Sequence, residues 1–197
     1  MIRGKSDRVW IYISCNNKDE LDILKNNLNN EDVNFGAIDD WMIPILTKGR
    51  NIVWDIPALQ FYLPGNTNLP PVKYETLPLT IEDSQTIYTN YTLKEYISLE
   101  YIRERIRKGV SAGIYKDNKP VSWGITQDDG AIGFLHTLDN YRRKGYGYRV
   151  VLSMTDKLTN SGNVPFAYIE PSNKKSINLF LKLGFKEYKK VHWFKIK

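Results

Sequence analysis

The sequence has a single cysteine, Cys15, and only two histidines, His136 and His192. One cysteine cannot form an intrachain disulfide, and two well-separated histidines leave no Cys/His cluster with metal-ligand spacing, so we expect no metal site. No window approaches the roughly 18 apolar residues of a membrane-spanning helix. The apolar run at residues 9–14 is too short for the core of a secretory signal. These absences predict a cytoplasmic protein that does not enter a membrane.

The composition excludes a disordered or fibrous chain. The 197 residues are 42% hydrophobic, 13% aromatic and 25% charged, which is ordinary globular usage. At about 150 residues per domain, this length predicts one domain with a smaller companion, or one enlarged domain. The net charge of +6, from 28 Lys and Arg against 22 Asp and Glu, favours an anionic partner. Nucleic acid, an acidic surface and a phosphorylated cofactor all remain open.

A linker or exposed loop is predicted at residues 63–72, which contain three prolines, a glycine and two asparagines. It separates a small N-terminal α+β region, residues 1–72, from a larger region, residues 73–197. No chemical motif is found in the N-terminal region. Its predicted elements are a strand at 9–14, a helix at 18–29, and two strands at 52–55 and 58–63 that are broken by Pro57.

The larger region is predicted to have the order β-α-α-β-β-β-α-β-α-β. The predicted elements are a strand at 74–79, helices at 80–89 and 92–108, strands at 110–116, 120–126 and 131–138, a helix at 146–158, a strand at 164–170, a helix at 173–183 and a strand at 187–195. The charged residues 103–108 are expected to form the solvated face of their helix rather than a nucleic-acid patch.

A basic, glycine-containing loop at residues 142–148 joins a predicted strand to a predicted helix. A helix N-terminus offers unpaired backbone N–H groups to an anion, and glycines let the backbone approach it closely. The dinucleotide fingerprint is incomplete because Val150 replaces its third glycine, and Tyr146 after Gly145 excludes a Walker loop. The loop is therefore interpreted as a pyrophosphate cradle, with an ordinary glycine-rich turn as the alternative.

At this point the sequence resembles the GNAT (GCN5-related) N-acetyltransferases. Arg142, Gly145 and Gly147 match the acyl-CoA-binding motif R-x-x-G-x-G of that family. Residues 173–185 match a second family motif, N-x-x-A-x-x-L-Y-x-x-L-G-F, at the spacing that the family uses. The element order also fits, so the resemblance covers roughly residues 74–197.

The narrower similarity is to the glycine N-acyltransferase-like, FR47-type members, through residues 120–123 and 136–146. The resemblance implies an α/β (α+β) GNAT fold: a mixed, mostly antiparallel central sheet with flanking helices, splayed at the acyl-CoA-binding strand. It also implies a bound acyl-CoA, most simply acetyl-CoA. The residues that it places at this cosubstrate are Leu135, His136, Thr137, Arg142, Arg143, Lys144, Gly145, Tyr146, Gly147, Tyr148, Asn173, Ser176 and Phe180.

The usual proton carriers of the family are missing. Ala131 stands where many members have a carboxylate that deprotonates the acceptor, and Phe180 replaces the usual tyrosine acid. His136, Asp129 with its neighbour Asp128, and Glu170 are the candidate bases. Each also has a structural interpretation, as a packed histidine, an ordinary turn or a helix cap. The candidate acids are Tyr168 and Tyr188, and water is an alternative.

The sequence thus predicts an acyl-CoA-dependent N-acyltransferase that transfers acetyl directly to the primary amine of a small molecule, with glycine as one example. The N-terminal region is expected to form a lid, an acceptor wall or a contact in a homodimer. The alternative is a catalytically weak or inactive CoA-binding or interaction module on the same scaffold. Nucleic-acid binding is a third and less favoured hypothesis.

Overall fold

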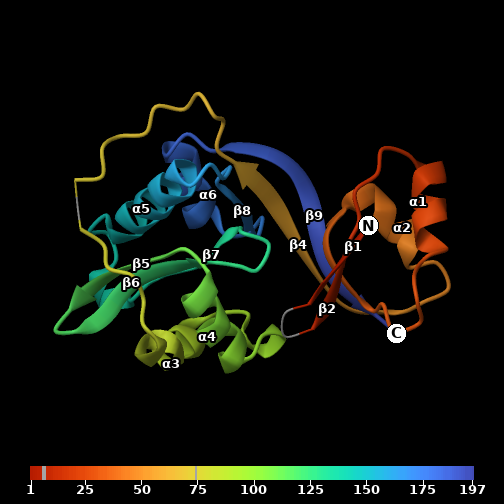
Figure 1. Cartoon of the computed structure of the whole chain (residues 1–197), viewed down its shortest axis with the longest axis horizontal. Coiled ribbons are helices and arrows are strands. Elements are labelled where there is room, and N and C mark those ends of the chain that lie inside the picture. Colours follow the sequence, from red (N-terminus) through yellow and green to blue (C-terminus); the bar gives the residue numbers. More distant parts are fainter. Residues whose placement is uncertain (6–7, 74) are drawn as a thin grey trace. The chain divides into compact units, whose positions relative to one another are not determined.

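The computed structural model describes residues 1–5, 8–73 and 75–197 and divides into two compact units (Figure 1). Unit 1 comprises Met1–Gln60, Ile169–Ser172 and Tyr188–Lys197, and unit 2 comprises Phe61–Tyr168 and Asn173–Glu187. No helix in these described ranges is long and apolar enough to cross a membrane. The boundary expected near residue 72 stays a prediction.

Unit 1 is built on strands that lie in the order β1-β2-β3-β9-β4. Their bounds are β1 Ile2–Lys5, β2 Val9–Tyr12, β3 Asn34–Asp39, β9 Lys186–Ile196 and β4 Ile52–Tyr62. β1 pairs antiparallel with β2, β2 parallel with β3, and β3 antiparallel with β9. Two helices, α1 (Lys18–Lys25) and α2 (Ile43–Leu46), accompany these strands. The side chain of Asn17 caps α1 by accepting a hydrogen bond from the Glu20 backbone N–H at 2.9 Å.

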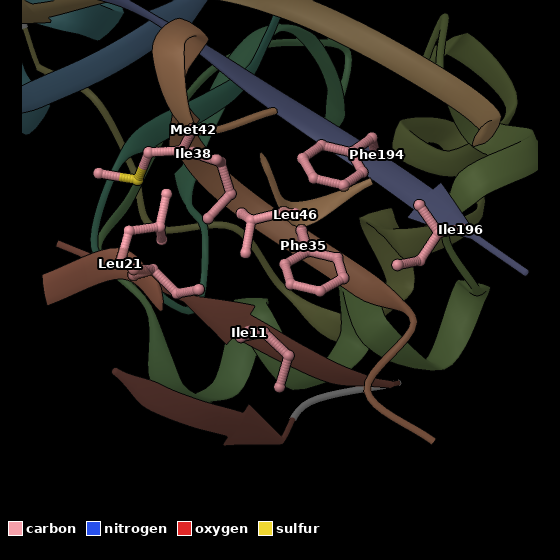
Figure 2. Packing of buried hydrophobic residues seen from close by; sticks show 9 residues of the cluster. Ile11, Leu21, Phe35, Ile38, Met42, Leu46, Phe194 and Ile196 are labelled. Carbon is pink, nitrogen blue, oxygen red and sulfur yellow. The ribbon is translucent and has the colours of Figure 1, made fainter. Parts of the chain in front are cut away.

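The core of unit 1 gathers between this sheet and its helices (Figure 2). Phe35 from β3 and Phe194 from β9 stack with ring centroids 4.9 Å apart, and Leu21 of α1 is fully buried in the same cluster. Burying such side chains contributes about 1.5–3 kcal/mol each. β3 does not keep the strict alternation of a regular strand, because its register shifts between the buried residues Phe35 and Ile38.

Unit 2 contains a separate three-stranded antiparallel sheet in the order β5-β6-β7. Its elements are η2 Ile81–Asp83, α3 Ser84–Asn90, η3 Lys94–Tyr96, α4 Leu99–Lys108, β5 Ser111–Lys116, β6 Lys119–Thr126, β7 Ile132–Thr137, η4 Asp139–Tyr141, α5 Tyr146–Asn160, β8 Phe166–Ile169 and α6 Lys174–Lys182. α5 packs along β5, β6 and β7, while α4 contacts β6. The buried side chains of α3 and α4 share one cluster with Trp123, Ile125 and Phe134 of the sheet.

A glycine lets α5 approach the sheet closely. A Cβ placed on Gly124 of β6 would lie 2.7 Å from the Met154 sulfur and 3.2 Å from Val150 Cγ1, both on α5. A larger residue there would therefore push the helix or its side chains away. This packing fixes α5, whose N-terminus carries the basic loop.

The structure corrects several predicted elements. Pro57 does not break a strand, because β4 runs through it from Ile52 to Tyr62. The predicted helix 92–108 is instead a 3-10 turn, η3, followed by α4, which Ser98 caps through the Tyr101 backbone N–H. The strand predicted at 74–79 begins at Tyr74, which lies outside the described residues, and Leu77 forms an isolated bridge with Gly113. The strands β1 and β3 and the helix α2 were not predicted.

Candidate functional site

The basic loop ends at a helix N-terminus with the backbone geometry of an anion cradle. Gly145 is the N-cap of α5 in the left-handed conformation, with φ 75° and ψ 9°, and its Cα faces open space. The Arg149 N–H donates to the Gly145 carbonyl at 3.1 Å, which is the first turn of the helix. The preceding N–H groups, in the first helical turn, have no intrahelical partner and carry the positive end of the helix dipole.

The cations of this loop are exposed and have different surroundings. Arg142 donates through Nε to the Thr137 carbonyl at 3.2 Å and pairs with Asp139 at 2.7 Å, so it braces the loop against the end of β7. The Lys144 ammonium lies 5.2 Å from the centre of the Tyr141 ring. Together with Arg143, these groups place positive charge beside the helix N-terminus.

β7 is the edge strand of its sheet and carries a bulge. The register shifts between the pairs Trp123–His136 and Ile125–Gly133, and Phe134 has a left-handed φ of 51°. A bulge of this kind re-aims backbone groups next to it. β8 ends the strand order of the other sheet, so within the described chain β7 and β8 belong to different sheets. The expected splay at the acyl-CoA-binding strand stays a prediction.

His136 packs against an aromatic ring. Its imidazole stacks on Trp123 with centroids 5.1 Å apart, and its backbone carbonyl accepts a hydrogen bond from Ser122 at 3.1 Å. Burial lowers the pKa of His136, and the nearby Arg142 lowers that pKa further. The neighbouring Thr137 hydroxyl lies 2.8 Å from the Ser122 hydroxyl.

Asp129 occupies the turn that leads into β7. Its Oδ1 accepts a hydrogen bond from the Ala131 N–H at 3.0 Å. Its Oδ2 is buried and has no partner with ordinary hydrogen-bond geometry among the described residues. Burial raises the pKa of Asp129 to about 6, with a smaller contribution from the neighbouring charge of Asp128. A carboxyl group with this pKa releases and accepts protons near neutral pH.

Tyr168 on β8 approaches this carboxyl group. Hydrogen bonding by the Tyr168 hydroxyl favours the charged form of Asp129 and so lowers the pKa of Asp129. In return, burial and the negative charge of Asp129 raise the pKa of Tyr168 above its ordinary value. The structure therefore brings together one candidate base and one candidate acid from the sequence analysis.

Other candidate residues from the sequence analysis either make structural contacts or are exposed. Asn173 caps α6 by accepting from the Ser176 backbone N–H at 3.1 Å. Phe180 is buried and packs edge-to-face on Phe185 with centroids 4.9 Å apart. Glu170 is exposed at the end of β8 and belongs to unit 1, as does the exposed Tyr188.

The sequence analysis missed two residues of α4 that contact the turn of Asp129. Tyr101 hydrogen-bonds Asp128, and Arg105 hydrogen-bonds the Gln127 carbonyl. Arg105 was assigned to a solvated face, but it is only 7% exposed. Little in the sequence indicates that Arg105 is buried, because a charged residue on a helix with five other charged residues is usually exposed.

A family model described as FR47-like protein matches residues 111–194. This range includes β5 to β8, the basic loop, α5 and α6. The match covers the turn of Asp129 and the whole of the cradle.

Solved structures share the fold at low sequence identity. An X-ray structure of a Drosophila protein has a TM-score of 0.73 and 19% identity, and the match covers 83% of this chain and 60% of that one. This chain thus spans less than two thirds of the Drosophila protein. A GNAT-family protein from Novosphingobium aromaticivorans gives a TM-score of 0.58 at 17% identity, covering 75% of this chain and 67% of that one. A GNAT-family acetyltransferase from Colwellia psychrerythraea has a TM-score of 0.58 at 14% sequence identity. The match covers 91% of this chain and 72% of that one.

The chain therefore has the mixed α/β fold of these solved GNAT-family structures, and its residues 111–194 match the FR47-like family model.

Proposed function

We propose that the chain is an acyl-CoA-dependent N-acyltransferase that transfers acetyl from acetyl-CoA to the primary amine of a small molecule. The observation that carries the proposal is the N-terminus of α5, where a left-handed Gly145 and the amides of the first turn meet three exposed cations. The FR47-like match over the same residues supports it.

The site fits a pyrophosphate without rearrangement. The Cα of Gly145 faces open space in which a side chain would stand, so the backbone is accessible to an anion. A Cβ on Gly147 would lie 3.6 Å from the Thr137 hydroxyl and 3.9 Å from Leu179. The loop therefore reaches both the end of β7 and α6. Amides 143–148 would hold the pyrophosphate, with Arg143 and Lys144 adding charge, and the open edge of β7 at Leu135, His136 and Thr137 would pair with the pantetheine arm.

Acetyl-CoA supplies an activated acetyl thioester when it is bound. Asp129 takes the proton that the acceptor ammonium must lose, because its raised pKa makes it an effective base near neutral pH. The amine nitrogen then forms a bond to the thioester carbon as the carbon–sulfur bond breaks. The bulge in β7 offers backbone N–H groups for the carbonyl oxygen. As the carbon–sulfur bond breaks, the attacking nitrogen loses its second proton, which would reach the thiolate sulfur of CoA through water or Tyr168, so the amide nitrogen is left neutral. Asp129 would then release the first proton to solvent.

Asp129 is favoured over the two other candidate bases. Its Oδ2 is buried, its carboxyl group interacts with Tyr168, and it lies on the turn entering β7. His136 is engaged in a ring stack, and Glu170 is exposed. The acceptor is proposed as a small-molecule amine. A homodimer and a lid or acceptor-wall role for residues 1–72 remain predictions.

Calorimetric titration with acetyl-CoA tests the cradle. Gly145→Glu should abolish binding, because the new carboxylate occupies the space that the pyrophosphate needs and repels it. Gly162→Glu is the matched control: Gly162 has the same φ of 75° and open surroundings, but it follows the other end of α5. Both variants carry similar backbone strain, so only the first should lose binding. No binding to the folded wild type would overturn the proposal.

Turnover separates an enzyme from a binding module. Release of free CoA in the presence of acetyl-CoA and primary amines such as glycine, ethanolamine or phenylethylamine is read with a thiol-reactive dye, after subtracting the signal of Cys15. Release that depends on an amine supports acyl transfer. Tight acetyl-CoA binding with no release from a broad set of amines would instead establish the inactive CoA-binding module.

A further inference from the structure

Two residues of α4, one helical turn apart, contact the turn that carries Asp129. Tyr101 and Arg105 are both buried, at 7% exposure each. Positions i and i+4 lie on the same face of a helix, so their side chains leave α4 in the same direction. They meet Gln127 and Asp128, the two residues that precede Asp129 in the chain.

The Tyr101 hydroxyl makes two hydrogen bonds to one residue. It donates to Asp128 Oδ1 at 2.7 Å and accepts from the Asp128 backbone N–H at 3.3 Å. The side chain and the backbone of Asp128 are thus both tied to the same oxygen. The Tyr101 ring is itself fixed, since it packs in the core cluster of unit 2 beside Phe134, with centroids 6.1 Å apart. Burial and the charge of Asp128 raise the pKa of Tyr101, so the hydroxyl keeps its proton.

Arg105 holds the preceding peptide. Its Nη1 donates to the Gln127 carbonyl at 3.1 Å, and its Nη2 lies 3.7 Å from Glu104 Oε1. The Gln127 carbonyl also accepts from the Gly130 N–H at 3.1 Å, which closes the turn. The Gln127 carbonyl oxygen therefore accepts both the hydrogen bond that closes the turn and a hydrogen bond from Arg105. Such a charge-assisted bond is stronger than a neutral one.

The turn is held by the paired ends of β6 and β7 and by its own hydrogen bonds, and the bonds from α4 add to these. The Gln127 N–H donates to the Ala131 carbonyl at 2.8 Å, and Asp129 Oδ1 accepts from the Ala131 N–H. These contacts shape the turn locally. The bonds from Tyr101 and Arg105 are long-range ones, spanning 27 and 22 residues.

We propose that Tyr101 and Arg105 are positioning residues, which clamp the β6–β7 turn so that Asp129 is held with one carboxylate oxygen buried beside Tyr168. This inference rests on the proposed function, in which Asp129 accepts the proton of the acceptor amine. A base on a connecting turn has to be held in place, since small displacements of a catalytic group are costly in rate. Because α4 packs in the core of unit 2, the hydrogen bonds from Tyr101 and Arg105 restrict the movement of that turn.

The clamp also sets the environment of the carboxyl group. Asp128, Tyr168 and the Asp129 backbone are the groups that act on the Asp129 charge besides burial and the Ala131 N–H. If the clamp is released, the turn is less firmly held and Asp129 should become more hydrated. Hydration removes the largest effect that raises the pKa of Asp129, so that pKa should fall toward its ordinary value near 4.

The test compares Tyr101→Phe with Tyr115→Phe. Tyr115 on β5 donates to Asp83 Oδ2 at 2.5 Å, so the control removes another tyrosine–aspartate hydrogen bond from the same unit, away from the turn. With acetyl-CoA and the best amine of the set above, Tyr101→Phe should lower kcat by about tenfold to a hundredfold. The acidic limb of its pH–rate profile should move to lower pH. The dissociation constant for acetyl-CoA should not change, because the cradle is intact.

Arg105 is tested by a graded pair of variants. Arg105→Met removes the bond to the Gln127 carbonyl, whereas Arg105→Lys keeps one donor and should restore part of the lost kcat. Arg103→Met is the matched control, since Arg103 lies on the same helix, is 40% exposed at its side chain and pairs with Glu100. If Arg105→Met does not fold, the comparison of Arg105→Lys with wild type carries the test. Equal kcat and pH profiles for all of these variants would overturn the role of Arg105.

A titration without turnover separates this inference from the proposed function. The carboxyl carbon of Asp129 is followed by NMR in protein labelled at aspartate, with Asp129→Asn providing the assignment. A lower Asp129 pKa in Tyr101→Phe, and an unchanged pKa in Tyr115→Phe, supports the clamp even if no amine is acetylated. An unchanged Asp129 pKa in Tyr101→Phe overturns the clamp, even if the wild type proves to be an active acetyltransferase.

Discussion

The imidazole of His136 stacks on the indole of Trp123 across the β6–β7 pair, with the ring planes 27° apart. A histidine on the edge strand of a predicted acyl-CoA site is an attractive base from the sequence alone. Its environment instead indicates a structural role. His136 is half-buried and packs on an aromatic ring, so it stabilises the pairing of β6 with β7. Burial lowers the pKa of His136, which favours the neutral form of its ring.

We expect His136→Phe to retain kcat within a few-fold, since phenylalanine preserves the stack on Trp123. Asp129→Asn should lower kcat by about 100-fold to 10,000-fold, the range for loss of a general base. The measurement is CoA release under saturating acetyl-CoA, with the fold of each variant checked by circular dichroism. The reverse ranking of the two variants would assign the base to His136 instead.

Asp129 should make stability depend on pH. A carboxyl group with a pKa raised to about 6 in the folded state binds its proton more tightly there than in the unfolded chain. Its favourable contribution is therefore complete below about pH 4 and is lost as the pH rises through 6. Asp129→Asn, which stays neutral, should raise the unfolding free energy at pH 8 by about 3 kcal/mol at most, at 1.36 kcal/mol per unit.

Urea unfolding at pH 4, 6 and 8 checks this pH dependence. The advantage of Asp129→Asn over wild type should grow from pH 4 to pH 6 and then level off. Asp128→Asn, a change at the exposed neighbour, serves as the control and should show a smaller pH-dependent difference. A constant difference across this range would mean that the pKa of Asp129 is the same in the folded and unfolded states.

Gly124→Ala should destabilise unit 2 by about 1–3 kcal/mol, the usual cost of overpacking. The added methyl group would lie 2.7 Å from the Met154 sulfur, so that α5 or the Met154 side chain must move. Thermal unfolding measures the loss. Gly65→Ala is the control, because its surroundings are open. Shortening the opposing side chain by Met154→Val should recover part of the stability in the double variant, and no recovery would argue against this contact as the cause.

In unit 1, His192 joins two aspartates. Its Nδ1 lies 2.8 Å from Asp55 Oδ1 and its Nε2 lies 2.8 Å from Asp40 Oδ1. Hydrogen bonds from Lys190 and then His192 lower the pKa of Asp40. A lowered carboxyl pKa stabilises the fold above the unfolded value near 4, and this stability is lost as the pH falls.

His192→Phe should therefore lower the unfolding free energy by about 1–3 kcal/mol at pH 7, and by less at pH 3. Denaturant unfolding at the two pH values gives the comparison. Lys189→Gln, which removes the exposed partner of Asp39, should cost about 1 kcal/mol or less at either pH. Equal losses for His192→Phe at both pH values would show that packing, and not the hydrogen bonds of His192 to Asp40 and Asp55, explains the effect.

The sequence by itself determined most of unit 2. Periodicity and turn residues predicted β5, β6 and β7, and the two-residue turn between β5 and β6 has the positive φ values, 49° and 60°, that Asp117 and Asn118 tolerate. The helices α5 and α6 and the glycine loop were also predicted, because their capping and backbone requirements are local. The family motifs fall in this same part of the chain.

Unit 1 was less predictable, because its strands pair over long distances. β9, the last strand, pairs with β3, so Phe194 finds Phe35 far earlier in the sequence. Short segments such as β1 and β3 carry too little periodicity to be recognised without those partners. Pro57 illustrates the same point, since the proline that locally indicates a break lies within the eleven residues of β4.

Only the tertiary structure decided which polar residues are buried. From the sequence, His136, Asp129 and Glu170 were candidate bases, each with a structural alternative, and Arg105 was expected to face solvent. The pKa of Asp129 depends on burial and on Tyr168 of β8, and the clamp depends on α4 meeting the β6–β7 turn. Local sequence patterns predict turns and helices, because the backbone conformation of these elements depends on residues that are close in the sequence. Desolvation and hydrogen bonding of a carboxylate are set by residues that are distant in the chain, and these become neighbours only when the sheet and helices pack.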